Sequence, residues 1–236
     1  MATTLTSLET QARRYLLETT ASFWSSAELV DIMNKAIKDL WRDIVDLKQE
    51  HFLTIDATNV TLAADTSTLT GVPAGVHKVY YIEPRDLTDT SSNKGLHFER
   101  VELNSEDFRS ARGASDVDPS NSVIYYAVIG EGAPVAAPTI RVAPQVSSAV
   151  NLTLGYVPVI ADKVAANDNP IPGESDNAVI AWTVAFARSK EREDRSPDPN
   201  WLVIYATEKQ HLLQSLGLRD YSKPEYVDAV FKQYWS

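Results

Sequence analysis

The spacing of apolar residues changes twice along this chain of 236 residues. In the first 50 residues, apolar side chains recur every three or four positions, which is the spacing of one face of an α-helix. Residues 51–160 instead contain short runs of β-branched and aromatic residues between turn residues, which is typical of strands. Helical spacing then returns at residue 178, after a turn-rich loop at residues 167–173. Because helical pairs flank the strand-rich segment, we predict an α+β fold in which a small antiparallel β domain is inserted into one antiparallel helical bundle.

These changes of period divide the chain into four zones. The predicted zones are an N-terminal helical hairpin (residues 1–50), an inserted β domain of about six strands (51–165), a pair of C-terminal helices that completes the bundle (166–217) and a C-terminal tail helix (218–236). One helical turn is also expected inside the β domain, at residues 104–108.

The second helix begins with several helix-start signals close together. Ser25 and Glu28 stand at capping-box spacing, so the serine hydroxyl accepts from the amide of Glu28 while the glutamate accepts from the amide of Ser25. Trp24 and Leu29 occupy the two positions of a hydrophobic staple. The helix continues with an apolar stripe typical of a scaffold helix, which comprises Leu29, Ile32, Met33, Ala36, Ile37, Leu40, Ile44 and Leu47.

Similar signals mark the ends of the other helices. Thr6 and Glu9 are spaced as a second capping box, at the start of the first helix. Trp182 lies in a helical run that begins at residue 178 and is interrupted by Ser-Pro at 196–197. Asp198, followed by a proline, caps the last helix of the pair, and Gly217 is expected to end it.

The terminal zone is unusually rich in aromatic residues for a chain end. A capping box at 222–225 predicts a short helix, and its apolar side chains are expected to leave water. They either fold back onto their own bundle or dock into a groove on a partner, and we expect a partner. The candidate docking residues are Tyr221, Tyr226, Val230, Phe231, Tyr234 and Trp235.

The composition excludes several classes of function. The chain has no cysteine, which rules out disulfides, a Cys-ligated zinc site and a thiol nucleophile, and fits a reducing cytoplasm. A net charge of −10 argues against a protein that grips nucleic acid. We also expect no secretory signal and no membrane span, because no apolar run is long enough for either.

No motif for catalysis or cofactor binding is present in the sequence. The four histidines are scattered without metal-ligand spacing, and no nucleophile elbow, phosphate-cradling loop or dinucleotide-binding turn occurs. Acidic residues in the turn-rich loops do not form an EF-hand pattern. We therefore expect no catalytic residue, no metal site and no cofactor.

Several short motifs follow one another in a characteristic order. The hairpin carries Phe-Trp-Ser-x-Ala-Glu-Leu at residues 23–29. Next come a turn with a proline, Val72-Pro73-Ala74, and a strand with a tyrosine pair, Ile124-Tyr125-Tyr126. They are followed by a strand that ends in proline, Ile140-Arg141-Val142-Ala143-Pro144, and by a strand with the pattern leucine-x-tyrosine, Leu154-Gly155-Tyr156-Val157-Pro158. Over nearly the whole chain, this order resembles the head-to-tail connector, or adaptor, proteins of tailed bacteriophages, of the larger type with a β insertion.

The resemblance implies a structural virion protein and no enzymatic activity. Proteins of this family form a ring, typically dodecameric, in the virion neck between the portal and the tail, with a channel for the genome. The implied partners are other copies of the chain, the portal protein and tail or nozzle proteins, while DNA passes without sequence-specific binding. Such a protein is made in the host cytoplasm and does not enter a membrane. An acidic ring would keep the duplex from sticking to the channel wall.

The resemblance also suggests roles for parts of the chain. Residues 27–50 and 178–195 are expected to pack between subunits and near the channel. The tail is expected to grip the portal, and the β domain to face outward or toward tail proteins. In such a ring each contact is head-to-tail, so two different faces of one subunit must be complementary.

Two other classes of function remain open from the sequence. A β-rich receptor- or carbohydrate-binding tail module with a helical stalk would expose aromatic residues on the β domain and form trimers. An enzyme would need a pocket with perturbed acidic groups, which a sequence does not reveal.

Overall fold

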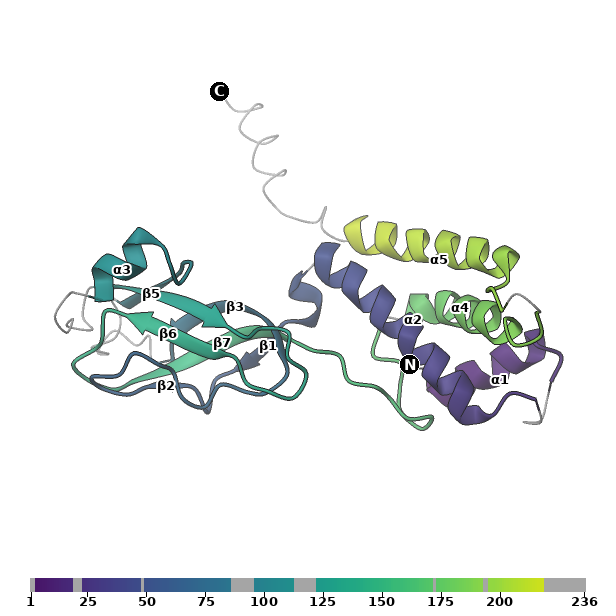
Figure 1. Cartoon of the computed structure of the whole chain (residues 1–236), viewed down its shortest axis with the longest axis horizontal. Coiled ribbons are helices and arrows are strands. Elements are labelled where there is room, and N and C mark those ends of the chain that lie inside the picture. Colours follow the sequence, from purple (N-terminus) through teal and green to yellow (C-terminus); the bar gives the residue numbers. More distant parts are fainter. Residues whose placement is uncertain are drawn as a thin grey trace, which may run out of the picture. The chain divides into compact units, whose positions relative to one another are not determined.

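The computed structural model describes residues 3–18, 23–47, 49–85, 96–112, 122–171, 173–192 and 195–218. The chain divides into two compact units, one formed by Met1–Gln49 together with Asp162–Ser236 and the other by Glu50–Ala161. Helices make up the first, which we call the helical unit, and strands dominate the second, which we call the β unit (Figure 1). The predicted α+β character of the chain is confirmed.

The helical unit is organised around one central helix. Its elements are α1 (Leu5–Tyr15), α2 (Ser26–Leu47), the 3-10 helix η2 (Gly173–Ser175), α4 (Asp176–Arg188) and α5 (Pro199–Leu218). Helix α4 packs against α1, α2 and α5. It presents small buried side chains, Ala178, Ala181 and Ala185, and small side chains allow neighbouring helices to approach closely. The interior of the helical unit is therefore built from segments at both ends of the sequence.

The β unit contains two sheets over one core. Its elements are η1 (Gln49–Phe52), β1 (Thr54–Asp56), β2 (Thr61–Leu62), β3 (Val76–Pro84), β4 (Leu96–Arg100), α3 (Glu106–Arg112), β5 (Ser122–Ile129), β6 (Thr139–Ala143) and β7 (Val150–Pro158). In one sheet β7 pairs with β1, β2 and β3, and the other has the order β4-β5-β6. Side chains of both sheets share a single buried cluster, which includes Val79, Ile82, Ile124, Ile140 and Leu152.

The prediction that the β domain is antiparallel is wrong at one pair of strands. β4 and β5 are parallel, with Leu96 opposite Ser122 and Arg100 opposite Tyr126. Two parallel strands need a crossover connection rather than a tight turn. The segment between them, residues 101–121, includes α3 and is long enough to make that crossover. The helical turn expected at 104–108 is confirmed as the start of α3.

Three helix ends differ from the predictions. Thr4, not Thr6, caps α1 by accepting from the amide of Ser7, while the Thr6 hydroxyl donates to the carbonyl of Ala165 at 2.7 Å. α5 continues through Gly217 to Leu218, and α4 ends at Arg188 rather than near 195. The predicted tail helix, with Tyr221, Tyr226, Val230, Phe231, Tyr234 and Trp235, lies outside the described residues.

Candidate interaction surfaces of the helical unit

No cluster of metal-ligating side chains is found in the part of the chain that the structure describes. There, His, Asp and Glu side chains do not gather in groups of three that could hold a metal ion. The histidines lie apart, in η1, β3, β4 and α5. None of the described helices combines the length and the apolar character needed to cross a membrane. The candidate features described below are surfaces and the polar clusters that hold them in shape.

The capping box at the start of α2 is confirmed. The amide of Ser25 donates to Glu28 Oε2 at 2.8 Å, and the amide of Glu28 donates to Ser25 Oγ at 3.2 Å. Lys190, just beyond α4, donates to Glu28 Oε1 at 3.0 Å. The hydrogen bond from the Ser25 backbone, followed by the one from Lys190, lowers the pKa of Glu28 to about 2. The cap thus also links α2 to the end of α4.

Trp24 joins the same two helices, which sequence spacing alone did not predict. Its indole Nε1 donates to the carbonyl of Ala187, in the last turn of α4, at 2.9 Å. Lys190 Nζ donates to the carbonyl of Phe23 at 2.8 Å and lies 4.9 Å from the centre of the Phe23 ring. The beginning of α2 is therefore held on the end of α4 by three contacts from adjacent residues.

A buried ionic network closes the turn between α1 and α2. Arg13 Nε donates to Glu9 Oε1 at 2.9 Å, and its Nη1 donates to Glu18 Oε2 at 3.2 Å. Nη2 of the same guanidinium donates to the carbonyl of Trp24 at 3.0 Å, and Ser26 Oγ donates to Glu9 Oε1 at 2.7 Å. Because Arg13 and Glu9 are both buried, the network fixes the geometry of this end of the helical unit.

A second polar cluster joins α2 to α5. Lys209 Nζ donates to Asp39 Oδ2 at 2.8 Å and also pairs with Asp43, while the Tyr205 hydroxyl donates to Asp39. Burial, together with the hydrogen bond to Asp39, raises the pKa of Tyr205 well above its usual range. Burial tends to raise the pKa of Asp39, but the hydrogen bonds from Lys209 and Tyr205 outweigh this effect and lower it. The carboxylate of Asp39 therefore stays charged while the Tyr205 hydroxyl stays protonated. This hydrogen bond links α2 to α5.

The remaining residues singled out from the sequence lie mainly in the core. Leu29, Ile37 and Leu40 are fully buried, whereas Ile32 is half-buried. Trp182 is half-buried and stacks on the ring of Phe186 with a centroid distance of 4.4 Å. These residues therefore support the surfaces of the helical unit rather than form them.

A hollow lies beside the N-terminal half of α2, and we call it the α2 hollow. It has a volume of about 370 Å³ and is lined by Ser26, Ala27, Val30, Asp31, Asn34, Asp162, Lys163, Val164 and Ala165. The side-chain amide of Asn34 pairs with the backbone of Lys163 in both directions, at 2.9 and 2.8 Å, and so holds the 162–165 segment in place. Val164 leaves 65% of its surface exposed at the edge.

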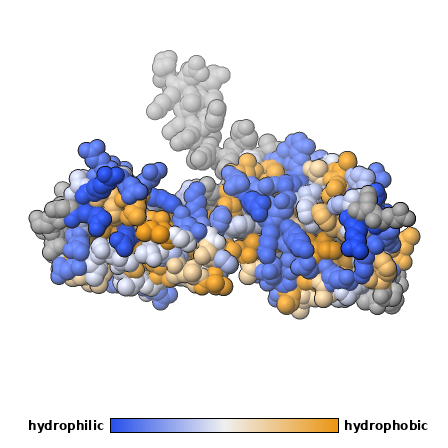
Figure 2. All heavy atoms as spheres, viewed as in Figure 1, coloured by the Kyte–Doolittle hydropathy of each residue, from blue (hydrophilic) through white to orange (hydrophobic). Residues whose placement is uncertain are grey.

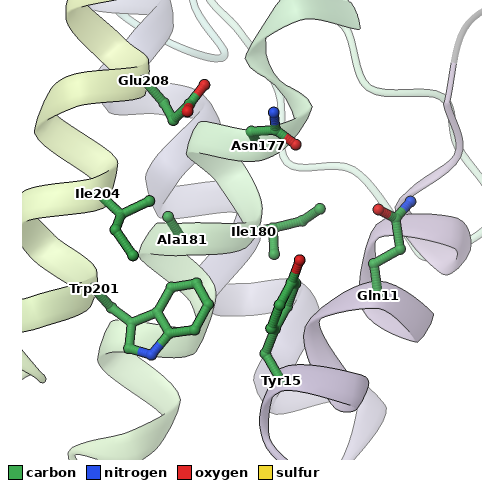
Figure 3. Close-up of a pocket in the computed structure, with 8 residues that line it drawn as sticks. All are labelled: Gln11, Tyr15, Asn177, Ile180, Ala181, Trp201, Ile204 and Glu208. Carbon is green, nitrogen blue, oxygen red and sulfur yellow. The ribbon is translucent and has the colours of Figure 1, made fainter.

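A second hollow, which we call the α5 groove, is formed by different helices. It has a volume of about 350 Å³ and is lined by Gln11, Tyr15, Asn177, Ile180, Ala181, Trp201, Ile204 and Glu208. Figure 3 shows α1 and α5 on either side and α4 behind, with Tyr15 and Trp201 at one end and Asn177 and Glu208 at the other. Neither hollow was predictable from the sequence, because each is lined by residues from distant segments.

Apolar side chains also reach the surface singly. Val203 on α5 is 67% exposed, and Ile204, Phe23 and Leu47 are exposed as well. Hydrophobic patches interrupt the hydrophilic surface on the face that Figure 2 shows. Contiguous apolar patches are typical of surfaces that contact other proteins, whereas single exposed apolar residues are common on any protein.

Comparison with known proteins yields no relative. No protein-family model matches this sequence. A comparison with curated proteins likewise finds no match. The surfaces and clusters described above therefore carry the functional argument.

Proposed function

We propose that this protein is a structural component of a phage virion: a head-to-tail connector that forms a ring, typically dodecameric, between the portal and the tail and lines the DNA channel. The order of sequence motifs supports this proposal. The net charge of −10 suits a channel through which DNA passes without adhering.

One observation carries the ring proposal. The helical unit offers a receptive surface and a projecting apolar surface on different elements: the α2 hollow, edged by Val164, and the exposed Val203 on α5. A head-to-tail contact between identical subunits needs two different, complementary surfaces, because each subunit uses one toward each neighbour. We assign Val203 of one subunit to the α2 hollow of the next.

The proposed architecture fits the same role. In the proposal, α1, α2, α4 and α5 form an antiparallel bundle that builds the ring, and the β unit is an insertion that faces outward or toward tail proteins. Both ends of the described sequence contribute helices to the helical unit. In this arrangement, changes in the β unit do not alter the surfaces of the helical unit that close the ring.

The experiment that tests the ring uses two interface variants. Val203→Asp and Val164→Asp each place a charge at an exposed site, where the folded subunit tolerates it within about 0.5 kcal/mol. Native mass spectrometry and negative-stain imaging of the unmodified protein should show closed rings, and either variant alone should remain monomeric. A mixture of the two should stop at dimers, because each pair retains one intact contact.

The control is Val135→Asp, which changes a more exposed valine in the β unit and should leave the rings intact. If neither the protein alone nor a mixture with portal protein from a candidate phage gives an annular assembly, the connector proposal fails. Dimers that form with equal ease in each single variant would refute the assignment of Val203 and the α2 hollow.

The second candidate is a β-rich receptor- or carbohydrate-binding tail module with a helical stalk. The partly exposed ring of Tyr80 on β3 favours it, because exposed aromatic rings suit sugar binding. This candidate predicts trimers in the same mass spectra, so one measurement separates the two proposals.

A further inference from the structure

The α5 groove has two chemically different ends. At one end, the rings of Tyr15 and Trp201 meet edge to face at 5.0 Å. Arg188 holds this end in place, because its Nη2 donates to the Tyr15 carbonyl at 3.0 Å and its guanidinium lies 5.9 Å from the Trp201 ring. The aromatic end is therefore preorganised to receive an apolar or aromatic side chain.

The other end of the groove is polar and acidic. Figure 3 shows the carboxylate of Glu208 and the amide of Asn177 there, with Ile180 and Ala181 between this end and the aromatic one. In the described part of the chain, no cation pairs with Glu208. An occupant of this groove should therefore combine aromatic side chains with a positive charge at a defined spacing.

We infer that the α5 groove is the docking site of residues 219–236 of the same chain. This segment begins where α5 ends, at Leu218, and has 18 residues. Its sequence contains an apolar stripe, with Val227, Phe231 and Trp235 at intervals of four, and one lysine, Lys232, at the edge of that stripe, three residues before Trp235. The segment therefore carries both features that the groove calls for, and the inference does not depend on the proposed ring.

The length of the segment matches the position of the groove. The capping box at 222–225 predicts a helix from residue 223, and residues 219–222 then form a connection of the length found in αα-hairpins. If residue 223 lies opposite residue 218 and both helices rise equally per residue, residue 232 lies opposite 209 and residue 235 opposite 206. The segment thus reaches the groove from its acidic end.

This register brings complementary groups together. Lys232 arrives at the level of Glu208, the acid that has no cation partner in the described structure. The neighbouring cation on α5, Lys209, is already bound to Asp39 and Asp43. In the same register, Tyr234 and Trp235 arrive opposite residues 207 and 206, which lie between Glu208 and Ile204 on α5.

The segment of the same chain outcompetes that of a second copy. A segment tethered directly to α5 has an effective concentration in the millimolar range, whereas a free copy is present at its bulk concentration. Docking within one subunit also covers the exposed aromatic residues of the segment before they meet a partner. Release from the groove then makes the segment available for a partner such as the portal.

Distance measurement between two spin labels tests this inference, and the cysteine-free chain allows specific labelling. Labels at Gln210 on α5 and Gln233 in the segment should give a narrow, short distance distribution. The distribution should persist when labelled protein is diluted with unlabelled protein. It should lose its short component in Ile204→Asp and keep it in Val203→Asp, which changes the adjacent position outside the groove.

A charge exchange provides an independent variant. Glu208→Lys should reduce the short-distance fraction several-fold, and adding Lys232→Glu to the same chain should restore it. Absence of a short distance in the unmodified protein, or a short distance that neither Ile204→Asp nor Glu208→Lys changes, would overturn the inference. Loss of the short distance on dilution would instead place the segment in the groove of a second copy and overturn docking within one chain.

Discussion

The indole Nε1 of Trp24 donates a hydrogen bond of 2.9 Å to the main-chain oxygen of Ala187, which lies 163 positions later in the sequence. Trp24 is only 4% exposed. The last carbonyls of a helix have no partner within that helix, and here the side chain at the start of α2 supplies one. The contact therefore joins the segments of the helical unit that precede and follow the β unit.

Trp24→Phe should lower the free energy of unfolding of the helical unit by about 1 kcal/mol, the typical net value of one hydrogen bond. The loss stays moderate because the Ala187 carbonyl also accepts from the amide of Lys190 at 3.1 Å. Urea unfolding followed by helical circular dichroism measures the change. Trp201→Phe is the matched control, since Trp201 is half-buried and its side chain makes only ring contacts in the described structure. Equal losses in both variants would contradict the role of the Trp24 hydrogen bond.

The cap at Ser25 predicts a specific pH dependence. The pKa of Glu28 falls from 4.5 to about 2 on folding, chiefly through the hydrogen bond from the Ser25 backbone. A lowered pKa in the folded state stabilises the protein above the unfolded value, and this contribution disappears as the pH falls through the folded value. The stability difference between the unmodified protein and Glu28→Gln should therefore be constant above about pH 5 and shrink between pH 4.5 and 2. A difference that stays the same down to pH 2 would be inconsistent with this cap.

Local interactions of this kind were predictable from the sequence. Ser25 and Glu28 are three positions apart, so their spacing alone specifies the geometry of the capping box. The partner of Trp24 was not predictable, because nothing near it in sequence indicates Ala187. Thr6 shows the same limit: its hydroxyl bonds to Ala165, so the predicted cap shifts to Thr4.

Two ion pairs of identical sequence spacing should differ strongly in their contribution to stability. Glu9 and Arg13 form a buried pair four positions apart, and Asp31 and Lys35 form an exposed one. Arg13→Met leaves the carboxylate of Glu9 buried without its cation, so the free energy of unfolding should fall by about 3 kcal/mol or more. Lys35→Met should cost less than about 1 kcal/mol, because water screens the exposed pair.

Chemical denaturation at neutral pH measures both losses. Combining Arg13→Met with Glu9→Gln should recover part of the loss, because the second change removes the unpaired charge. A loss in Arg13→Met no larger than that in Lys35→Met would show that the Arg13 network does not stabilise the fold.

The strands illustrate a second limit of prediction. Runs of β-branched and aromatic residues indicated strands in residues 51–160, and β5 and β6 contain the motifs that begin at Ile124 and Ile140. These runs did not predict that β4 and β5 are parallel, since the composition of one strand does not specify the direction of its neighbour. The α5 groove was unpredictable for a related reason: its walls come from α1, α4 and α5, which meet only in the folded chain. The prediction that the terminal aromatic residues grip the portal stays a prediction, because these residues lie outside the described structure.

Gly71 is expected to be the least replaceable glycine of the β unit. Its φ of +74° lies in the left-handed region, and a Cβ placed there would lie 1.9 Å from the main-chain oxygen of Asn59. The turn around it aligns Thr61 with Thr70, whose backbones exchange hydrogen bonds of 3.1 and 2.9 Å. Gly71→Ala should therefore combine the strain of a left-handed alanine, about 1–2 kcal/mol, with displacement of the Asn59 backbone.

Gly130→Ala separates these two effects. Gly130 has a similar φ of +82°, but a Cβ there meets nothing within 4 Å. Gly130→Ala should thus lose only about 1–2 kcal/mol, the penalty for the left-handed conformation. Thermal unfolding of the β unit, followed by the near-ultraviolet signal of its tyrosines, should show a clearly larger loss for Gly71→Ala. If the two substitutions lower the stability equally, backbone conformation alone explains why glycine is needed at residue 71, and the close approach of Asn59 has no energetic consequence.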